Sequence, residues 1–157
     1  MEYEYFSQRG MEDKLQEFIR MINNKERGGF NAMLAPRLVA ADWEQRCCTL
    51  AYYAEPWMSN PAGITHGGIL SAAADLTMGM LSIYLVQGNG ITPSASISVN
   101  YLLPVPLEKD FWVTATADHI GRHLNQFTCS IVSAKEPDKP CVTAIGTYYV
   151  HKLYKEK

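Results

Sequence analysis

Residues 67–86 read GGILSAAADLTMGMLSIYLV, a nearly continuous apolar stretch in a chain of 157 residues. Its length and composition predict one helix over Gly67–Val86, ended by Gly88-Asn89-Gly90. A helix with apolar residues on nearly every side must be wrapped by other structure. A membrane span is disfavoured because Asp75, Thr77, Gly79 and two serines interrupt the stretch.

Strand-like runs follow this helix. They cover Ser94–Leu103, Phe111–Ile120, Leu124–Ala134 and Cys141–His151. The first alternates, with Ala95, Ile97, Val99, Tyr101 and Leu103 on one face and Ser94, Ser96, Ser98 and Asn100 on the other. Gly121-Arg122-His123 predicts a hairpin turn between the second and third runs, and Glu136–Pro140 a turn before the last. These runs predict four strands in a meander.

The residues before the central helix contain a second helix and about two strands. Met11–Lys25 carries apolar residues at helical spacing and predicts a surface helix laid on the domain. Met33–Val39 is expected to be extended, Arg46–Ala54 predicts a strand, and Glu55–Thr65 predicts a loop. The fold class is therefore α+β, with a mainly antiparallel sheet of five to six strands curled around the central helix. We expect an N-terminal helical segment at residues 1–32, a single domain at 33–152 and a frayed tail at 153–157.

Composition limits the function classes. The chain is 47% hydrophobic and 19% charged, with a formal net charge of −2, which gives no electrostatic reason to expect nucleic acid as a partner. The four cysteines lack C-x-x-C spacing, and no secretory signal opens the chain, so a cytoplasmic protein with free thiols is expected. His119 and His151 lack partners at metal-ligand spacing, and no metal or separate cofactor is expected. No G-x-S-x-G elbow supports a serine hydrolase.

Asp75 is the one charged residue between Gly67 and Val86. A carboxylate in a buried helix is costly unless it is paired or used in chemistry. Burial disfavours its ionised form, which suits a general base or a nucleophile. The alternative is an aspartate bonded to backbone or to a serine or threonine, or exposed at a gap in the sheet, and the residue alone does not decide between them.

His66-Gly67-Gly68 lies at the start of the same helix. Glycines there allow close approach to backbone N–H groups, which carry the positive end of the helix dipole. A carbonyl oxygen that gains negative charge during acyl transfer would be stabilised by these groups. The alternative is an ordinary turn into a helix, with glycines present for tight packing.

Helix geometry separates these two features. Gly68 and Asp75 are seven residues apart, which places them on one face but roughly 10 Å apart along the axis. A reacting carbonyl must lie about 3 Å from both its oxyanion donor and its attacking group. Two helices running antiparallel across a two-fold axis meet this demand, because each Asp75 then faces the partner's Gly67–Gly68 end. We therefore expect an obligate homodimer with two composite sites.

The segment Asn60–Gly68 reads NPAGITHGG, and Asp75 follows nine residues after His66. This pattern, N-x-x-G-x-x-H-G-G with the aspartate in register, resembles hot-dog-fold acyl-CoA thioesterases of the phenylacetate-degradation type. The resemblance extends over about Leu34–His151, counting strand order and turns. It implies a hot-dog fold, in which a long helix is wrapped by a curved antiparallel sheet, and hydrolysis of acyl-CoA thioesters.

The resemblance also implies residue roles. The Gly67 N–H would polarise the thioester carbonyl, with Gly68 beside it in the substrate site. His66 and Asn60 would position the substrate or the attacking water. Asp75 of the other subunit would act as general base or nucleophile. Some relatives place a water-orienting hydroxyl at the position of Ser94, although a plain serine at a strand edge is an equal alternative here.

Substrate contacts are less well defined by the sequence. Arg122 and His123, in the predicted hairpin turn, are candidates for the phosphates of coenzyme A, and Lys152 is a weaker one; a solvated turn is the competing interpretation. Trp57, Met58, Met78 and Leu81 are candidates for an apolar acyl pocket, although such residues more often belong to a core. The acyl group is expected to be hydrophobic or aromatic.

Other functions share this fold, because fold alone does not fix function. A hot-dog hydratase or dehydratase is one alternative, which the placement of Asp75 disfavours. A non-catalytic acyl-CoA sensor is another, and the intact set of Asn60, His66, Gly67 and Asp75 argues against it. Acyl carrier protein could replace coenzyme A as the thiol carrier. Relatives often assemble two dimers into a tetramer, and we expect a homotetramer here as well.

Overall fold

The computed structural model describes residues 4–24, 26, 28–87 and 90–152. The expected frayed tail at 153–157, and Gly88 and Asn89 of the expected helix-ending turn, lie outside the described residues. The helices are α1 (Gln8–Ile22), α2 (Phe30–Leu34), a 3-10 turn (Pro56–Met58) and α3 (Gly67–Leu85). The strands are β1 (Arg37–Asp42), β2 (Cys47–Tyr53), β3 (Gly90–Ile91), β4 (Ser94–Tyr101), β5 (Asp110–Ile120), β6 (Leu124–Ser133), β7 (Glu136–Tyr149) and β8 (His151–Lys152).

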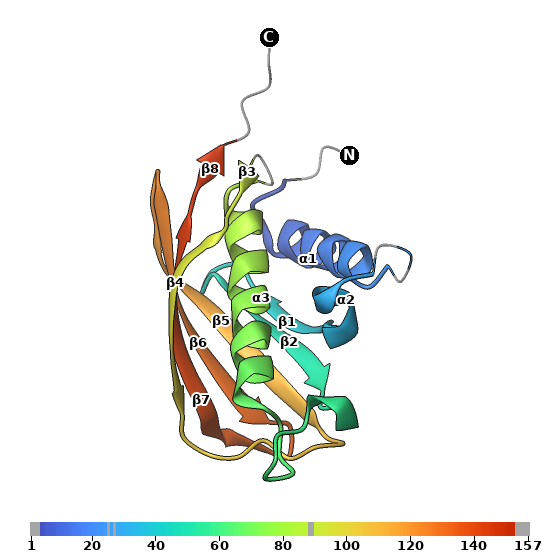
Figure 1. Cartoon of the computed structure of the whole chain (residues 1–157). Helices are drawn as coiled ribbons and strands as arrows, with labels where there is room; N and C mark the ends of the chain where they lie inside the picture. Colours follow the sequence, from blue (N-terminus) through green and yellow to red (C-terminus); the bar gives the residue numbers. More distant parts are fainter. Residues whose placement is uncertain (1–3, 25, 27, 88–89, 153–157) are drawn as a thin grey trace.

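Six strands form one antiparallel sheet in the order β1-β2-β5-β6-β7-β4. Strands β5, β6 and β7 follow one another as predicted, but β4 does not join them as the first strand of a meander. It crosses over to pair with β7 at the far edge, with Ser98 opposite Ile145. This crossing carries the chain around α3, so the sheet encloses the helix on both sides of its axis (Figure 1).

Helix α3 lies along the concave face of the sheet and matches its predicted bounds within one residue. Its buried side chains pack on inward-facing residues of β2, β5, β6 and β7. Its buried polar groups are paired: the Thr77 hydroxyl bonds Tyr52 at 2.8 Å, and the Asn125 amide donates to Ser82 at 3.1 Å. Among the described residues α3 is the one helix long and apolar enough to cross a membrane, and over half of that stretch is buried inside the fold.

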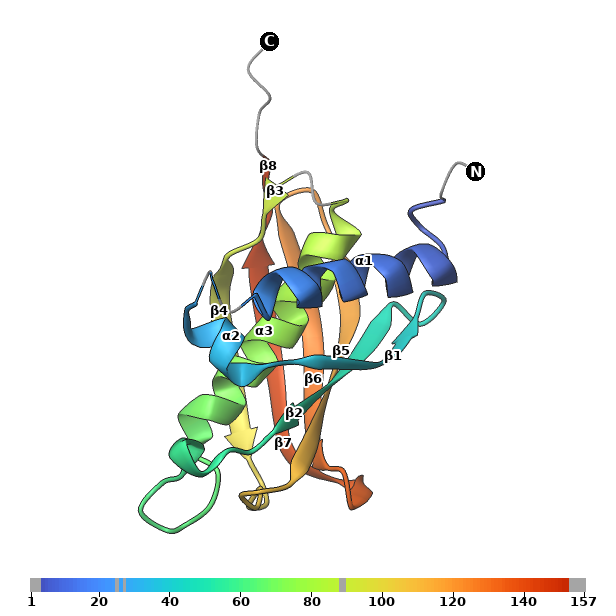
Figure 2. The same ribbon diagram turned by 90° about the vertical axis from the view of Figure 1, so that its right-hand side faces the viewer.

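Helix α1 crosses over α3 and lies beside β1 (Figure 2). Ser7 caps its N-terminus by accepting a hydrogen bond from the Gly10 N–H at 3.0 Å. Met11 and Leu15 of the predicted apolar face are fully buried, whereas Phe18 is half-buried. The expected surface helix is therefore confirmed, although it begins and ends about three residues earlier than predicted.

Two local predictions are wrong. The stretch expected to be extended over Met33–Val39 instead begins with the end of α2, and β1 starts only at Arg37 after Ala35 takes a left-handed φ of 46°. A turn was expected at Glu136–Pro140, but β7 already begins at Glu136, and the turn lies at the residues just before that strand. The register of β6 and β7 shifts in this region, and such irregular pairing tolerates prolines that cannot donate to the ladder.

Strand β4 is less covered than its alternation predicts. Ile97 and Val99 are half-buried, but Ala95, Tyr101 and Leu103 from the same predicted face are exposed. The reason is that β4 is an edge strand, paired only with β7 in the described chain. Its free edge and the exposed apolar residues at its end leave a surface that a single chain does not cover.

Candidate active site

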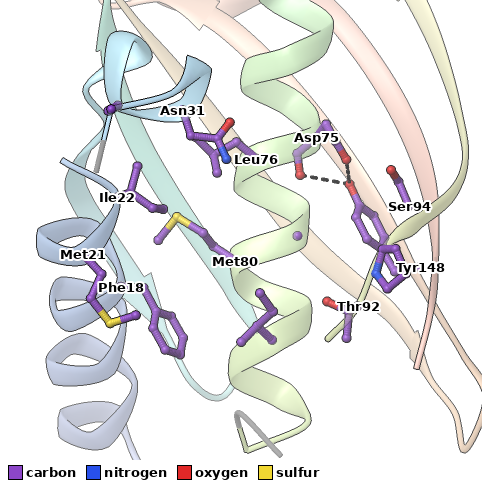
Figure 3. A pocket seen from close by; sticks show the side chains of 15 residues that line it. Phe18, Met21, Ile22, Asn31, Asp75, Leu76, Met80, Thr92, Ser94 and Tyr148 are labelled. Carbon is purple, nitrogen blue, oxygen red and sulfur yellow. Dashed lines mark hydrogen bonds between the residues drawn. The ribbon is translucent and has the colours of Figure 1, made fainter. Parts of the chain in front are cut away.

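Asp75 lies in the middle of α3 with its side chain half-buried. The Tyr148 hydroxyl, at the end of β7, is 2.9 Å from Asp75 Oδ1 and 3.0 Å from the Asp75 main-chain oxygen, and can donate to either (Figure 3). The carboxylate is therefore held by one tyrosine at the boundary between core and solvent, rather than being enclosed in the core.

Tyr148 is itself suited to act as a permanent donor. Its own burial, followed by the nearby negative charge of Asp75 and their hydrogen bond, raises the pKa of Tyr148 far above its ordinary value. The hydroxyl therefore keeps its proton at neutral pH. A hydrogen bond donated to a carboxylate fixes its orientation and stabilises its ionised form.

Replacing Tyr148 with phenylalanine is expected to lower kcat about tenfold with little change in KM, because one charge-assisted hydrogen bond of about 1.5–3 kcal/mol is lost beside the reacting group. Tyr149→Phe is the matched control. Tyr149 is the next residue along β7, its side chain is exposed, and it forms no hydrogen bond with Asp75 among the described residues. Steady-state kinetics on both variants give the answer. An unchanged kcat in Tyr148→Phe would mean that Asp75 does not need this donor.

A cavity of about 690 Å³ opens beside Asp75. It lies between α1 and α2 on one side and α3 with the segment before β4 on the other (Figure 3). Ser94, the predicted water-orienting residue, lines this cavity together with Asp75. The cavity is lined by Phe18, Met21, Ile22, Gly28, Asn31, Ala32, Asp75, Leu76, Gly79, Met80, Ile83, Thr92, Pro93, Ser94 and Tyr148.

The His66-Gly67-Gly68 segment forms the N-terminus of α3. His66 is the N-cap residue, and its Nδ1 accepts a hydrogen bond from the Gly68 N–H at 2.9 Å. A nitrogen that accepts carries no proton, so the neutral imidazole has its proton on Nε2. Gly67 is the first helical residue, and its N–H donates no hydrogen bond within the described part of the chain. This free N–H is the donor that the sequence predicted for a developing oxyanion.

Asn60 holds the loop that leads to this helix. Its Oδ1 accepts from the N–H groups of Ala62 at 2.9 Å and Ile64 at 3.3 Å. Gly63 adopts a φ of 74° in the same loop, a conformation that favours glycine. The Asn60 side chain therefore has a structural role through its oxygen, and its Nδ2 makes no hydrogen bond among the described residues.

The two predicted halves of the site do not meet within one chain. Gly67 opens on a separate hollow of about 300 Å³ that also includes Asn60, Tyr101 and Leu102, and this hollow shares no lining residue with the cavity beside Asp75. Eight residues of helix separate Gly67 from Asp75, about 12 Å along the axis. The structure therefore keeps these two groups apart within one chain, at the separation that helix geometry predicts.

The residues predicted to line an acyl pocket lie elsewhere. Met58, Met78 and Leu81 are fully buried in the core and line none of the cavities described. Met78 fills the space over Gly146, where a β-carbon would come within 2.9 Å of its sulfur, so β7 and α3 approach closely there. Trp57 is exposed and also lines no described cavity. Within one chain, Met58, Met78 and Leu81 therefore belong to the core, the alternative that the sequence had left open for them.

Sequence reasoning missed three contributors to the site: Tyr148, Gly79 and α1. A tyrosine on the inward face of the last strand was visible from alternation, but its contact with Asp75 depends on how β7 sits against α3. The half-buried positions of α1, Phe18 and Ile22, were read as packing and instead reach the cavity wall.

The candidates for coenzyme A phosphates lie in the exposed turn between β5 and β6. Arg122 lines a small hollow of about 320 Å³ near the C-terminal end of α3, next to Gln87, and His123 is exposed beside it. This hollow belongs to the opposite end of α3 from Gly67. The side chain of Lys152 lies outside the description.

Comparison with known proteins bears on both the fold and the site. Residues 62–139, which include Gly67, Asp75 and Ser94, match the family model described as the Thioesterase superfamily. They form a domain of that superfamily. The thioesterase domain thus contains the whole of α3 and all of β4, β5 and β6.

Solved structures similar to this chain carry the same fold. Thioesterase superfamily member 2 from zebrafish shares 18% identity, covers 88% of this chain and 97% of its own, and superposes with a TM-score of 0.77. The PaaI protein of the phenylacetic acid degradation operon from E. coli shares 16% identity over 89% and 94% of the two chains, with a TM-score of 0.72. The predicted hot-dog fold, and the likeness of the thioesterase domain to the phenylacetate-degradation type, are therefore confirmed.

A curated relative gives a shorter match. Acyl-coenzyme A thioesterase THEM4 from Xenopus laevis is 36% identical over 52 residues, which is 33% of this chain. The matched segment spans 22% of the length of that protein.

Proposed function

We propose that this protein hydrolyses acyl-CoA thioesters to a free acid and coenzyme A. The observation that carries the proposal is Asp75, a half-buried carboxylate held by Tyr148 at the mouth of an apolar cavity. The thioesterase-superfamily domain and the activity named for the THEM4 relative support the same reaction.

The chemistry begins with the thioester carbonyl near Asp75 and its acyl group in the cavity. Asp75 either takes a proton from water as the water oxygen attacks the carbonyl carbon, or attacks that carbon itself to give an anhydride that water then opens. The carbonyl oxygen gains negative charge, which the Gly67 N–H of a second copy would stabilise. The C–S bond then breaks, and coenzyme A leaves as its thiolate, which takes up a proton.

A second copy of the chain is proposed because Gly67 and Asp75 of one chain lie too far apart to act on the same carbonyl. Strand β4 has a free edge, and Tyr101, Leu102 and Leu103 form an exposed apolar surface where it ends, beside the hollow at Gly67. A two-fold pairing of β4 with its copy would cover this surface and run the two α3 helices antiparallel. Ser94 begins this strand and lines the cavity together with Asp75, which supports the proposal that its hydroxyl binds the attacking water.

Coenzyme A would lie with its thiol end between Asp75 and the copy's Gly67. Arg122 and His123, exposed beside the hollow at the end of α3, are the groups proposed for its phosphates. His66 keeps an Nε2 proton and Asn60 keeps an Nδ2 donor, and both are available to the substrate or to water.

The direct test is release of free thiol from a panel of aliphatic and aryl acyl-CoAs. Three of the protein's four thiols are expected to add little background, because burial raises the pKa of Cys129 to about 12 and raises those of Cys48 and Cys47 as well. A blank without substrate corrects for the remainder. Turnover on any member supports the thioesterase, whereas acyl-CoA binding without turnover on any member contradicts it and points to a sensor.

The composite site predicts complementation between two inactive variants. Asp75→Asn and Gly67→Pro each disable both sites of a homodimer, but a heterodimer of the two contains one site with both defects and one with none. We expect the heterodimer, isolated from co-expression with two different affinity tags, to show about half of wild-type activity per dimer. Both homodimers, purified in the same way, should be nearly inactive. A heterodimer as inactive as its parents would contradict a site shared between subunits.

A further inference from the structure

The cavity beside Asp75 is lined mostly by apolar side chains. Among the residues that the structure describes, Asp75 is the one charged side chain in the lining. The cavity's apolar walls and its volume of about 690 Å³ suit the acyl group.

The far wall of the cavity comes from α1. Phe18, Met21 and Ile22 face the cavity from the side opposite Ser94 and Tyr148 (Figure 3). Met21 is 47% exposed although it is a large apolar side chain, so it borders open space instead of filling the core. The N-terminal segment therefore does more than cover the domain, because it completes a binding wall.

The near wall comes from α3, and the residue at position 79 sets the width of the cavity there. Gly79 lies four residues after Asp75, one turn along the same helix face and about 6 Å away along the axis. A β-carbon at this position would meet only the Tyr148 ring, at an ordinary contact distance of 3.5 Å, and would otherwise point into the cavity. Glycine weakens a helix interior, so its presence here leaves room beside the reacting carboxylate at some cost in stability.

We propose that Gly79 and Met21 set the acyl specificity of this protein. Gly79 admits acyl groups that are wide close to the carbonyl, such as those with branched or cyclic substituents, and Met21 limits their length at the far wall. This inference rests on the proposed thioesterase function and deepens it. It assigns a specificity role to the N-terminal helix, which lies before the matched thioesterase-superfamily residues.

The first test fills the space at Gly79. Gly79→Ala adds one carbon in an ordinary contact, and Gly79→Leu adds a side chain that extends into the cavity. We expect the ratio of kcat/KM for a branched acyl-CoA to that for acetyl-CoA to fall at least tenfold in Gly79→Leu and by less in Gly79→Ala. The melting temperature of Gly79→Ala should not fall, because alanine favours the helix.

The second test uses two exposed methionines. Met21→Trp enlarges a side chain on the cavity wall, whereas Met33→Trp makes the same change on α2 at a residue that is 55% exposed and does not line the cavity. We expect the ratio of kcat/KM for dodecanoyl-CoA to that for hexanoyl-CoA to fall at least fivefold in Met21→Trp and to stay within twofold of wild type in Met33→Trp. Met21→Ala should shift the ratio in the opposite direction.

The outcomes separate this inference from the proposed function. If wild type hydrolyses acyl-CoAs but the Gly79 and Met21 variants change every substrate by the same factor, the specificity assignment is overturned and the thioesterase stands. If wild type hydrolyses none, the same acyl-CoAs are titrated by calorimetry into wild type and each variant. The specificity assignment would also be overturned if the ratio of the dissociation constants of two acyl-CoAs were the same in every variant as in wild type.

Discussion

Replacing Asp75 with asparagine is expected to lower kcat for acyl-CoA hydrolysis by about 10³-fold, within the range for loss of a general base or nucleophile. Asparagine keeps the size of the side chain, and its oxygen can still accept the hydrogen bond from Tyr148, which lies 2.9 Å from Oδ1 in the wild type. It lacks the charge needed to take a proton from water or to attack the carbonyl. Thiol release from the best acyl-CoA of the panel measures the loss.

The control for this substitution is Asp118→Asn. Asp118 is an exposed carboxylate on β5 that accepts a hydrogen bond from Thr128 and is remote from the cavity of Asp75. Its variant should retain wild-type kcat, and both variants should keep the melting temperature and the elution volume of wild type. Turnover of Asp75→Asn within tenfold of wild type would remove Asp75 from the chemical step.

Replacing Gly67 with proline is expected to lower kcat by about 10²- to 10³-fold, the usual loss for one oxyanion donor. Proline deletes the N–H and suits the first residue of a helix. The residue before it must be extended, and His66 already has φ −61° and ψ 134°. Helix α3 of the Gly67→Pro variant should therefore form normally, and the variant should lack only the N–H donor of residue 67.

Gly67→Ala isolates that N–H group. Alanine adds the same β-carbon, which meets the Tyr101 ring at 3.0 Å, and keeps the donor. The Tyr101 ring needs to shift by only a few tenths of an ångström to relieve this contact, so the alanine variant should stay within a few fold of wild type. Steady-state kinetics on both variants decide the matter: equal kcat in the two would mean that the Gly67 N–H does not stabilise the transition state.

The fold was predictable wherever a local pattern had one structural solution. An apolar stretch of helical length bounded by glycines gave α3 within one residue, and the β5–β6 hairpin turns at Gly121–His123 as expected. The place of β4 was not predictable, because alternation shows which side chains share a face but not which strand is the neighbour. The expected turn at Glu136–Pro140 failed because two prolines there are accommodated by irregular pairing instead.

The candidate site, like the fold, was predictable from the sequence only in part. The spacing of Asn60, His66, Gly67 and Asp75 was sufficient to propose a candidate site, since the pattern consists of residue types at fixed positions along one loop and one helix. For Met78 on that same helix the sequence left open an acyl pocket or the core, and the structure places it in the core, whereas Gly79, the next residue, lines the cavity. Adjacent helical residues point about 100° apart, and only the position of the sheet decides which of them is covered.

The sequence by itself determined the separation of the two groups proposed to react, because 1.5 Å per residue keeps Gly67 and Asp75 about 12 Å apart along the axis of any straight helix. The tertiary structure alone decided which groups stand beside them. Tyr148 reaches Asp75 across 73 residues of chain, and α1 reaches the cavity from the other end of the sequence. Such contacts depend on how the sheet curls around α3 and on how α1 crosses α3. The spacing of apolar residues within one element does not specify how that element packs against another.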